Sequence, residues 1–306
     1  MLYPVRSIFK QMRTTLVLSK YVGGFGNRLY LHIHVLAAAM EHGFSVVNLT
    51  LHQQAHLFEG LWANSFCRFP APVLGLPLHP LARAFRGLAE NLASLQERHP
   101  GRVPSAYLWI LENDRHQSME DSLFLEVCRR YRWVNLQGWE FRANTCVLHH
   151  RDAIRDFLRF RRSLHPALSF LLDESHARGK TRVCLHIRMG DFRHWEGGRH
   201  YIAPEEYARA AHQIARNESG RSLEFWVCSD EPVDLAPFPP GTRTTPGRTL
   251  AEDFQVMLES DFILGGISTF SRTAAFLGGA FIQRMKPGAE VPDLGSWSSG
   301  ARALEE

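Results

Sequence analysis

The 306-residue chain is poor in lysine and cysteine and has no long uncharged apolar run. Only four of its 35 basic residues are lysines, so arginine carries nearly all the positive charge, and the net charge is a modest +4. The densest basic stretch, residues 151–162, interleaves arginines with aspartates and apolar residues at helical spacing, which indicates a solvated helix face. Nucleic-acid binding requires a concentrated basic face with aromatic platforms. We therefore expect no nucleic-acid partner.

The five cysteines are scattered, odd in number and free of any C-x-x-C spacing, which excludes a regular disulfide framework. They are typical of small buried apolar residues in a reducing compartment. No stretch reaches the ~18 apolar residues that cross a bilayer, and no segment has the pattern of a cleavable leader. We expect a cytoplasmic protein without a transmembrane segment, able to make peripheral contact with the inner face of the membrane.

Histidine is abundant, with 16 residues, and three pairs raise the question of a metal. The pairs are His32 with His34, His149 with His150, and His194 with His200. Residues two apart on a helix face different directions, and none of the pairs lies beside a carboxylate at zinc-site spacing. We expect no metal and no cofactor.

Apolar strands alternate with helical stretches in two series along the chain. The first series predicts strands at 15–22, 44–51, 107–111 and 133–136, with helices at 27–42 and 82–98. A long helical stretch at 151–178 follows. The second series predicts strands at 182–188, 223–228, 261–264 and near 281, with helices at 204–216, 250–258 and 269–277. The fold class is therefore α/β, with two Rossmann-like domains, residues 1–150 and 151–306, facing across a cleft.

The most informative stretch is VCLHIRMGDF, residues 183–192, in which an apolar strand runs into polar residues. Polar groups at the carboxyl end of a strand usually mark a ligand crevice. Arg188 offers a planar fork of donors that matches phosphate or carboxylate oxygens. Gly190 permits close backbone approach, and Asp191 can orient the arginine or bind a hydroxyl. The residues alone fit an anion site and a simple Arg188–Asp191 ion pair equally well.

Two later stretches have the same character. FWVCSDE ends an apolar strand in Ser229 and Asp230, which either line a crevice or cap the next element. Further on, Ser268, Thr269 and Ser271 cluster at the start of a helix. Three hydroxyls exceed what one cap requires, and hydroxyls with free amides suit phosphate oxygens.

The first glycine-rich turn, GGFGNR, lacks the G-x-G-x-x-G spacing of a dinucleotide site. Gly24 and Gly26 can expose helix amides to an anion, with Asn27 and Arg28 reaching a polar ligand. A plain strand-to-helix turn capped by Asn27 explains the same residues.

In their order, GGFGNRLY, LHIRMGDF, FWVCSDE and DFILGGISTFSRTAAFLG resemble the α-1,2-fucosyltransferases of the GT11 type. They are also similar to the wider GT-B superfamily that contains the α-1,6- and protein O-fucosyltransferases. The resemblance spans residues 23–279. It implies a metal-independent, inverting GT-B enzyme that moves L-fucose from GDP-fucose to a glycan hydroxyl, usually α-1,2 to a galactoside. The N-terminal domain would lie on the acceptor side, and the C-terminal domain would bind the nucleotide sugar.

The resemblance also implies roles for individual residues. Arg188 would bind the diphosphate, His186 would face the guanine or ribose, and Asp253 would hold the guanine edge. The remaining donor-binding residues would be Ser229, Asp230, Ser268, Thr269 and Ser271, and the cleft on the acceptor side would be lined by Gly24, Gly26, Asn27 and Arg28. The base that deprotonates the acceptor would be Asp191 or Glu196.

Two positions depart from the family pattern. Met189 stands where a second arginine is frequent, and Arg272 with Thr273 stands where tryptophans are common. These departures leave open a nucleotide-sugar-binding protein without transferase activity, or a GT-B enzyme with another GDP-sugar or acceptor. A sulfotransferase also uses a basic phosphate pocket, but the ordered set of motifs argues against it.

Overall fold

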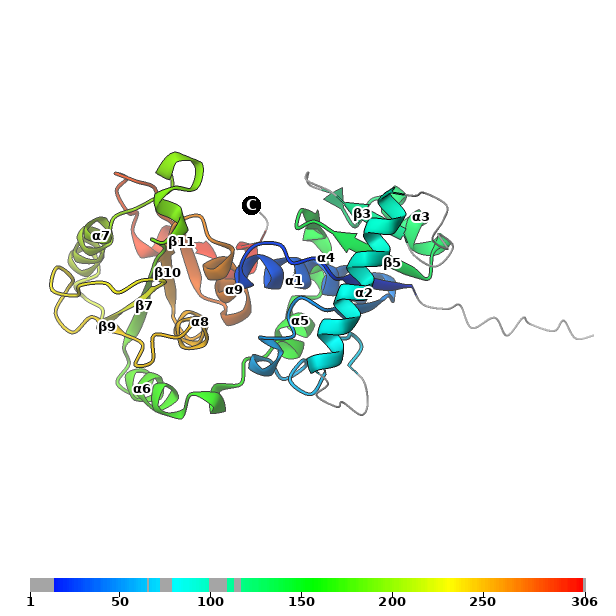
Figure 1. Ribbon diagram of the computed structural model, residues 1–306. Helices are drawn as coiled ribbons and strands as arrows, with labels where there is room; N and C mark the ends of the chain where they lie inside the picture. Colours follow the sequence, from blue (N-terminus) through cyan, green and yellow to red (C-terminus); the bar gives the residue numbers. More distant parts are fainter. Residues whose placement is uncertain (1–13, 65, 72–78, 99–108, 113–116, 305–306) are drawn as a thin grey trace, which may run out of the picture. The chain divides into compact units, whose positions relative to one another are not determined.

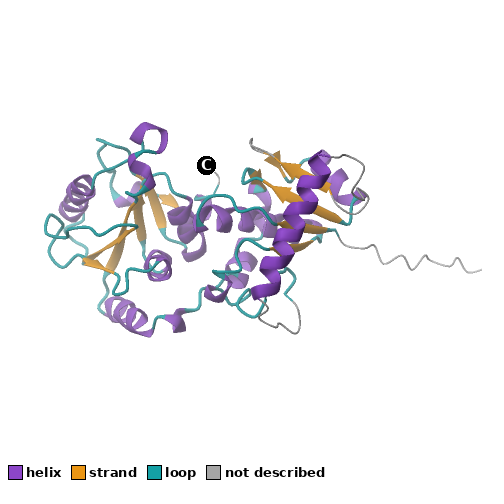
Figure 2. Cartoon of the chain, in the orientation of Figure 1, coloured by secondary structure: helices purple, strands orange, loops and turns teal. Residues whose placement is uncertain are grey.

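The computed structural model describes residues 14–64, 66–71, 79–98, 109–112 and 117–304. The chain divides into two compact units, each built on a parallel sheet with helices (Figures 1 and 2). The first unit comprises residues 1–23, 31–56 and 60–150, and the second comprises residues 24–30, 57–59 and 151–306. The main division thus falls between His150 and Arg151, while two short segments from the N-terminal half belong to the second unit.

The first unit contains a four-stranded sheet in the order β2-β1-β5-β3, with every pair parallel. Its strands are β1 (Thr15–Leu18), β2 (Ser45–Asn48), β3 (Trp109–Glu112) and β5 (Trp133–Gln137), and a separate two-stranded sheet pairs β4 (Gln117–Ser118) with β6 (Phe141–Arg142). The helices are α1 (Phe25–His42), α2 (His79–Arg98), α3 (Ser122–Arg130) and α4 (Asn144–His149), with a 3₁₀ turn η1 (Ala55–Leu57). The start of α1, Phe25–Tyr30, and the last residue of η1 belong to the second unit. One apolar cluster of this unit joins Val17, Val47 and Leu49 to Ala89 of α2.

The second unit contains a six-stranded sheet in the order β12-β11-β10-β7-β8-β9, parallel except for the β11–β12 pair. Its strands are β7 (Thr181–Ile187), β8 (Leu223–Ser229), β9 (Arg243–Thr244), β10 (Phe262–Gly265), β11 (Phe281–Arg284) and β12 (Ser298–Ser299). Its helices are α5 (Arg151–Phe157), α6 (Pro166–Ala177), α7 (Pro204–Asn217), α8 (Leu250–Leu258) and α9 (Thr269–Gly278). Its 3₁₀ turns are η2 (Arg162–Leu164), η3 (Asp191–Arg193), η4 (Trp195–Gly198), η5 (Leu294–Ser296) and η6 (Gly300–Arg302).

The strand order of this sheet reverses between β7 and β10. From β7 the chain proceeds to β8 and β9 on one side, and then to β10 and β11 on the other. Gly265, the last residue of β10, pairs with His186, and Ser229, the last residue of β8, pairs with Ile187. Open α/β sheets bind ligands outside the carboxyl ends of the strands at such a reversal. The topology therefore brings the turns after β7, β8 and β10 to one edge.

Most predicted elements of both series are present, but the long helix predicted over 151–178 is wrong. The structure has two helices there, α5 and α6, separated by η2. Pro166 accounts for the start of α6, because proline suits the first helical position and disrupts a helix interior. Before it, residues 159–161 leave the helix and hydrogen-bond to the segment Leu57–Glu59. The strand predicted at 107–111 is β3 over its described part, and residues 107–108 lie outside the described residues.

Five phenylalanines hold the two N-terminal segments in the second unit. The cluster consists of Phe25, Phe58, Phe160, Phe254 and Phe270. The ring of Phe254 on α8 lies 5.4 Å from that of Phe25 and 5.2 Å from that of Phe270. Since buried aromatic rings contribute large apolar areas, this cluster anchors the first turn of α1 to α8 and α9.

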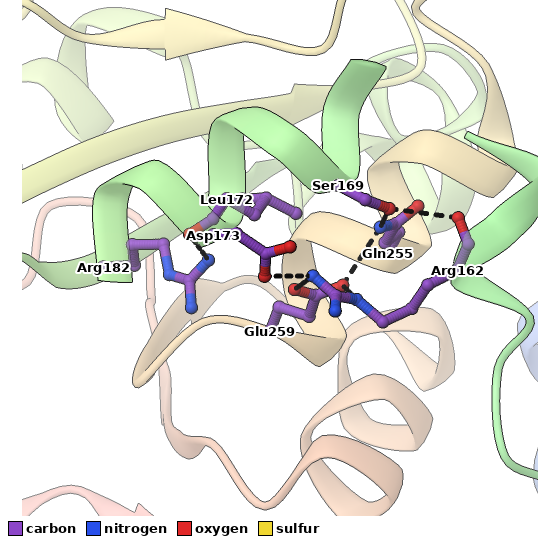
Figure 3. Close-up of polar contacts among 7 residues, drawn as sticks. All are labelled: Arg162, Ser169, Leu172, Asp173, Arg182, Gln255 and Glu259. Atoms are coloured by element: carbon purple, nitrogen blue, oxygen red, sulfur yellow. Dashed lines mark hydrogen bonds and ion pairs between the residues drawn. The ribbon is translucent and has the colours of Figure 1, made fainter. Parts of the chain in front are cut away.

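The arginine-rich stretch 151–162 is paired with acidic groups and carbonyls. Arg162 donates to Asp173 of α6 at 2.7 Å and to both oxygens of Glu259 at 2.8 and 2.9 Å, as Figure 3 shows. Gln255 of α8 donates to Ser169 of α6 at 2.8 Å in the same network. These contacts fasten α6 to α8, and the hydrogen bond to Asp173 is the main reason why the pKa of Arg162 is raised.

All five cysteines are buried and unpaired, as their scattered positions predict. Burial raises the pKa of the Cys67 and Cys128 thiols to about 12. Within the described ranges, no helix combines the length and apolar character needed to cross a membrane.

We expect Gly278→Ala to destabilise the second unit by about 1–3 kcal/mol, the usual cost of overpacking. A Cβ at this last residue of α9 would lie 2.1 Å from the backbone oxygen of Leu258. The matched control is Gly87→Ala in α2, where a Cβ meets no atom within 4 Å and the better helix former should stabilise by about 0.5–1 kcal/mol. Urea unfolding of both variants checks the signs, and a neutral Gly278→Ala would contradict the packing of α9 on α8.

Candidate functional site

Arg188 lies directly after β7 and is held by two carboxylates. Its Nε and Nη2 contact Asp191 Oδ1 at 2.9 and 2.8 Å, and its Nε lies 3.4 Å from Asp230 Oδ2. The Arg188 side chain is 39% exposed and Asp191 is 62% exposed, so this is a solvent-accessible ion pair. The structure thus contains the Arg188–Asp191 pair that the sequence allowed, with the guanidinium still accessible to a ligand.

Asp230 connects the turn after β7 to the end of β8. Its Oδ1 accepts a hydrogen bond from the backbone N–H of Met189 at 2.8 Å. A Cβ at Gly190 would lie 2.9 Å from Asp230 Oδ2, so glycine is what allows this approach. Asp230 therefore fixes the backbone that carries Arg188.

A pocket of about 160 Å³ opens beside this turn, at the carboxyl end of β8. Its apolar walls come from Val227, Val233 and Leu235, and its polar lining includes Ser229 and Asp253. One water occupies about 30 Å³ of liquid, so the pocket exceeds the needs of a single ordered water. Apolar walls with a few convergent polar groups are the usual make-up of a small-molecule site.

Asp253 on α8 is the buried carboxylate of this pocket. Its Oδ1 accepts from the Thr245 hydroxyl at 2.8 Å, and the backbone N–H of Ser229 also binds it. Burial raises the pKa of Asp253 to about 6, against the opposing effect of these hydrogen bonds. An ionised carboxylate has about four lone-pair sites, so Asp253 can accept N–H groups from a ligand besides these hydrogen bonds.

Sequence reasoning missed Thr245 and Arg248, which lie in a Pro/Gly-rich stretch without periodicity. Arg248 lines the same pocket as Asp253 and has a left-handed backbone with a φ of 48°. A non-glycine residue in this region is strained, and such strain concentrates at ligand sites. A capping box of Thr249 and Glu252 follows at the start of α8. This helix-start signal could have located the end of the loop from the sequence.

The three hydroxyls at the start of α9 have partners close by. Ser268 is the N-cap and accepts from the N–H of Phe270 at 3.3 Å, while the buried Ser271 donates to the Ser268 carbonyl at 3.2 Å. Thr269 donates to the side-chain oxygen of Asn27. Capping therefore accounts for Ser268, and Thr269 serves to join α9 to the first turn of α1.

The GGFGNR turn packs closely on the start of α9. A Cβ at Gly26 would lie 2.6 Å from the backbone nitrogen of Phe270, whereas one at Gly24 meets nothing within 4 Å. The buried Arg28 turns back on its own helix start, with Nε donating to the Gly24 carbonyl at 3.4 Å. The structure thus brings Gly26 and Asn27 to α9 within the second unit, next to the carboxyl end of β10.

His186 is 5% exposed, and its ring lies 5.5 Å from that of Phe270. Burial, with a smaller effect of Arg188, lowers its pKa to about 3, so the ring is neutral. Its Nδ1 is buried with no hydrogen-bond partner among the described residues.

Glu196 lies in η4 with a positive φ of 50°. Its carboxylate forms ion pairs with Arg199 and, at 3.1 Å, with His200, whose ring packs on Trp195 at 4.9 Å. This Glu196–His200 pair is 38% and 20% exposed.

Both departures from the family pattern have structural roles. The Met189 side chain is 3% exposed and belongs to the apolar core that includes Ile187 and Ile202. Arg272 donates to the Ala303 carbonyl and lies 5.3 Å from the ring of Tyr30. Met189 therefore contributes no charge to the crevice, and the Arg272 guanidinium binds the Ala303 carbonyl.

One histidine pair lies beside a carboxylate after all. Glu41, more than 100 residues away in the chain, contacts both His149 and His150. Sequence spacing could not predict this contact, because it depends on how α4 packs against the end of α1.

No protein-family model matches the chain, and no curated protein matches its sequence. Solved structures do match. FUT1 of Arabidopsis thaliana, a mutant in complex with GDP, superposes with a TM-score of 0.57 at 11% identity, covering 94% of this chain and 73% of that one. Fucosyltransferase NodZ from Bradyrhizobium gives 0.51 at 15% identity, covering 90% and 97%. The chain has the GT-B fold of fucosyltransferases.

We expect Asp253→Asn to stabilise the protein at neutral pH. The folded state raises the pKa of this carboxyl from 3.8 to about 6, so its contribution to stability is present below about pH 4 and is lost as the pH rises through about 6. Since each pKa unit equals about 1.4 kcal/mol, the variant should gain about 2–3 kcal/mol over the wild type at pH 7 and nothing at pH 4. Urea unfolding across this range measures the difference, and a gain that does not change with pH would contradict the buried carboxylate.

Proposed function

We propose that the second unit binds a GDP-sugar, with the base in the Asp253 pocket and the diphosphate at Arg188. The observation that carries this proposal is a buried carboxylate among apolar walls, next to an accessible guanidinium at the strand-order reversal of a GT-B fold. Apolar walls suit the faces of a nucleobase. The carboxylate suits a base edge that presents hydrogen-bond donors.

Guanine fits this pocket better than adenine does. Guanine presents an N1–H and an N2–H donor side by side on its Watson–Crick edge, which a carboxylate accepts together. Adenine presents an acceptor at N1, which an ionised Asp253 repels. Specificity for guanine would therefore arise because adenine leaves the buried Asp253 carboxylate without hydrogen-bond donors, which is costly.

Arg188 and Arg248 would neutralise the diphosphate. As the bond between the sugar and phosphate breaks, negative charge grows on GDP, and a fixed cation is then worth most in the transition state. Arg248 would supply the second positive charge that Met189 does not, since it follows β9 and lines the pocket together with Asp230, which binds the Met189 N–H. We propose that no metal ion is needed at the diphosphate.

The reaction we propose is inverting transfer of L-fucose from GDP-fucose to a glycan hydroxyl. The GT-B fold shared with NodZ supports fucosyl transfer, and the ordered motifs from residue 23 to 279 support α-1,2 transfer to a galactoside. The acceptor oxygen attacks the anomeric carbon, GDP leaves, and a base takes the hydroxyl proton. The five buried thiols support a cytoplasmic setting, where a glycan at the inner face of the membrane would be the acceptor.

Glu196 is the base we propose, with Asp191 as the alternative. The Asp191 carboxylate accepts from Arg188, so it is engaged with the guanidinium that we assign to the diphosphate. Glu196 contacts His200, an imidazole that can relay the proton onward.

A nucleotide-sugar-binding protein without turnover is the second candidate. It shares the pocket but would release no GDP from GDP-fucose in the presence of any galactoside. A GT-B enzyme for another GDP-sugar would release GDP only from that donor.

Arg188→Ala should weaken GDP binding and lower the rate of transfer about 10²–10³-fold, the usual cost of losing one such donor. The matched control is Arg162→Ala, since Arg162 is also a partly exposed arginine paired with two carboxylates, but in the α6–α8 network. Thermal shift with GDP and ADP gives the binding readout, and GDP release gives the rate. The proposal fails if GDP stabilises the wild type no more than ADP, or if the two variants behave alike.

Glu196→Gln should lower kcat at least about 100-fold with little change in KM, because the base acts in the chemical step. Asp191→Asn should instead raise the KM for GDP-fucose, since it removes the negative charge that orients Arg188. Steady-state rates of both variants decide the assignment. A normal kcat in Glu196→Gln would contradict the role of Glu196, and a loss of kcat in Asp191→Asn would then assign the base to Asp191.

A further inference from the structure

The first unit contains a cluster of three potential metal ligands that the proposed function does not use. Glu41 is the penultimate residue of α1, His149 is the last residue of α4, and His150 follows it. Their ligand atoms all lie within 4.8 Å of one another. Glu41 Oε2 lies 2.8 Å from His149 Nδ1 and 2.7 Å from His150 Nε2.

The spacing of these atoms suits a small divalent cation. Zinc binds histidine nitrogens and carboxylate oxygens at about 2.0–2.2 Å, which places tetrahedral ligands roughly 3.3 Å apart. The two nitrogens already converge on one carboxylate oxygen, and the imidazole rings lie side by side with centroids 4.6 Å apart.

The surroundings of the cluster also favour a cation. The carboxyl end of the 18-residue α1 carries the partial negative charge of the helix dipole, and Glu41 adds a full one. His149 is 69% exposed, Glu41 35% and His150 22%, so the ion has access from solvent. Solvent water can supply the fourth ligand.

The ligand types select among metals. Magnesium and calcium prefer all-oxygen sites, whereas two imidazoles and one carboxylate suit zinc and its first-row neighbours. We propose that Glu41, His149 and His150 form a zinc-type site that clasps the end of α1 to the end of α4. This site is independent of the proposed transfer reaction, whose residues lie in the second unit.

Zinc binding to the untagged full-length chain tests this proposal, measured by competition with a chromophoric chelator. We expect one saturable equivalent in the wild type, and at least about tenfold weaker binding in His149→Ala, His150→Ala and Glu41→Gln. His176→Ala is the matched control, because this exposed histidine lies on α6, and it should bind as the wild type does.

His149→Ala is the decisive variant, since a largely exposed side chain can be removed without disturbing the fold. Saturating zinc should also raise the Tm of the wild type and of His176→Ala but not that of His149→Ala. Equal zinc affinity in His149→Ala and the wild type would overturn the proposal, and so would the lack of saturable binding in the wild type.

Discussion

The carboxylate of Asp230 is the contact on which the candidate site depends. It accepts the backbone N–H of Met189 and lies 3.4 Å from the guanidinium of Arg188, so one side chain at the end of β8 fixes the turn after β7. Gly190 leaves room for this contact, because a Cβ there would lie 2.9 Å from Asp230 Oδ2 and would require the Asp230 side chain to shift. Through this contact, Asp230, which also lines the pocket, holds the Arg188 guanidinium at the strand-order reversal of the sheet.

Two other features of the second unit also shape the candidate site. The phenylalanine cluster anchors the first turn of α1 to α8 and α9, so the GGFGNR motif is part of this unit. Burial raises the pKa of Asp253 to about 6, so the carboxyl is mostly ionised at neutral pH. A buried carboxylate without enough hydrogen-bond donors destabilises the folded state. The buried carboxylate therefore favours a ligand that brings N–H donors.

Much of the fold was predictable from sequence, because the strands are short apolar runs separated by amphipathic helices. The carboxyl-end rule then located Arg188, Asp191, Ser229 and Asp230 at one edge. Ser268 and Ser271 bond within the first turn of α9, as ordinary capping predicts. The burial of His186, the Thr269–Asn27 contact and the Asp230–Met189 contact were not predictable, since each depends on packing between distant segments. Arg248 was missed because its loop has no periodic pattern. The contact of Glu41 with His149 and His150 was missed because Glu41 and His149 are 108 residues apart in the chain.

We propose that the Asp253 pocket and Arg188 together bind a guanosine diphosphate. A crystal structure of the chain with GDP tests it most directly. We expect the guanine edge within hydrogen-bond distance of the Asp253 carboxylate, and the diphosphate oxygens on the Arg188 guanidinium. A guanine bound elsewhere on the chain, with the Asp253 pocket still occupied only by solvent, would contradict it.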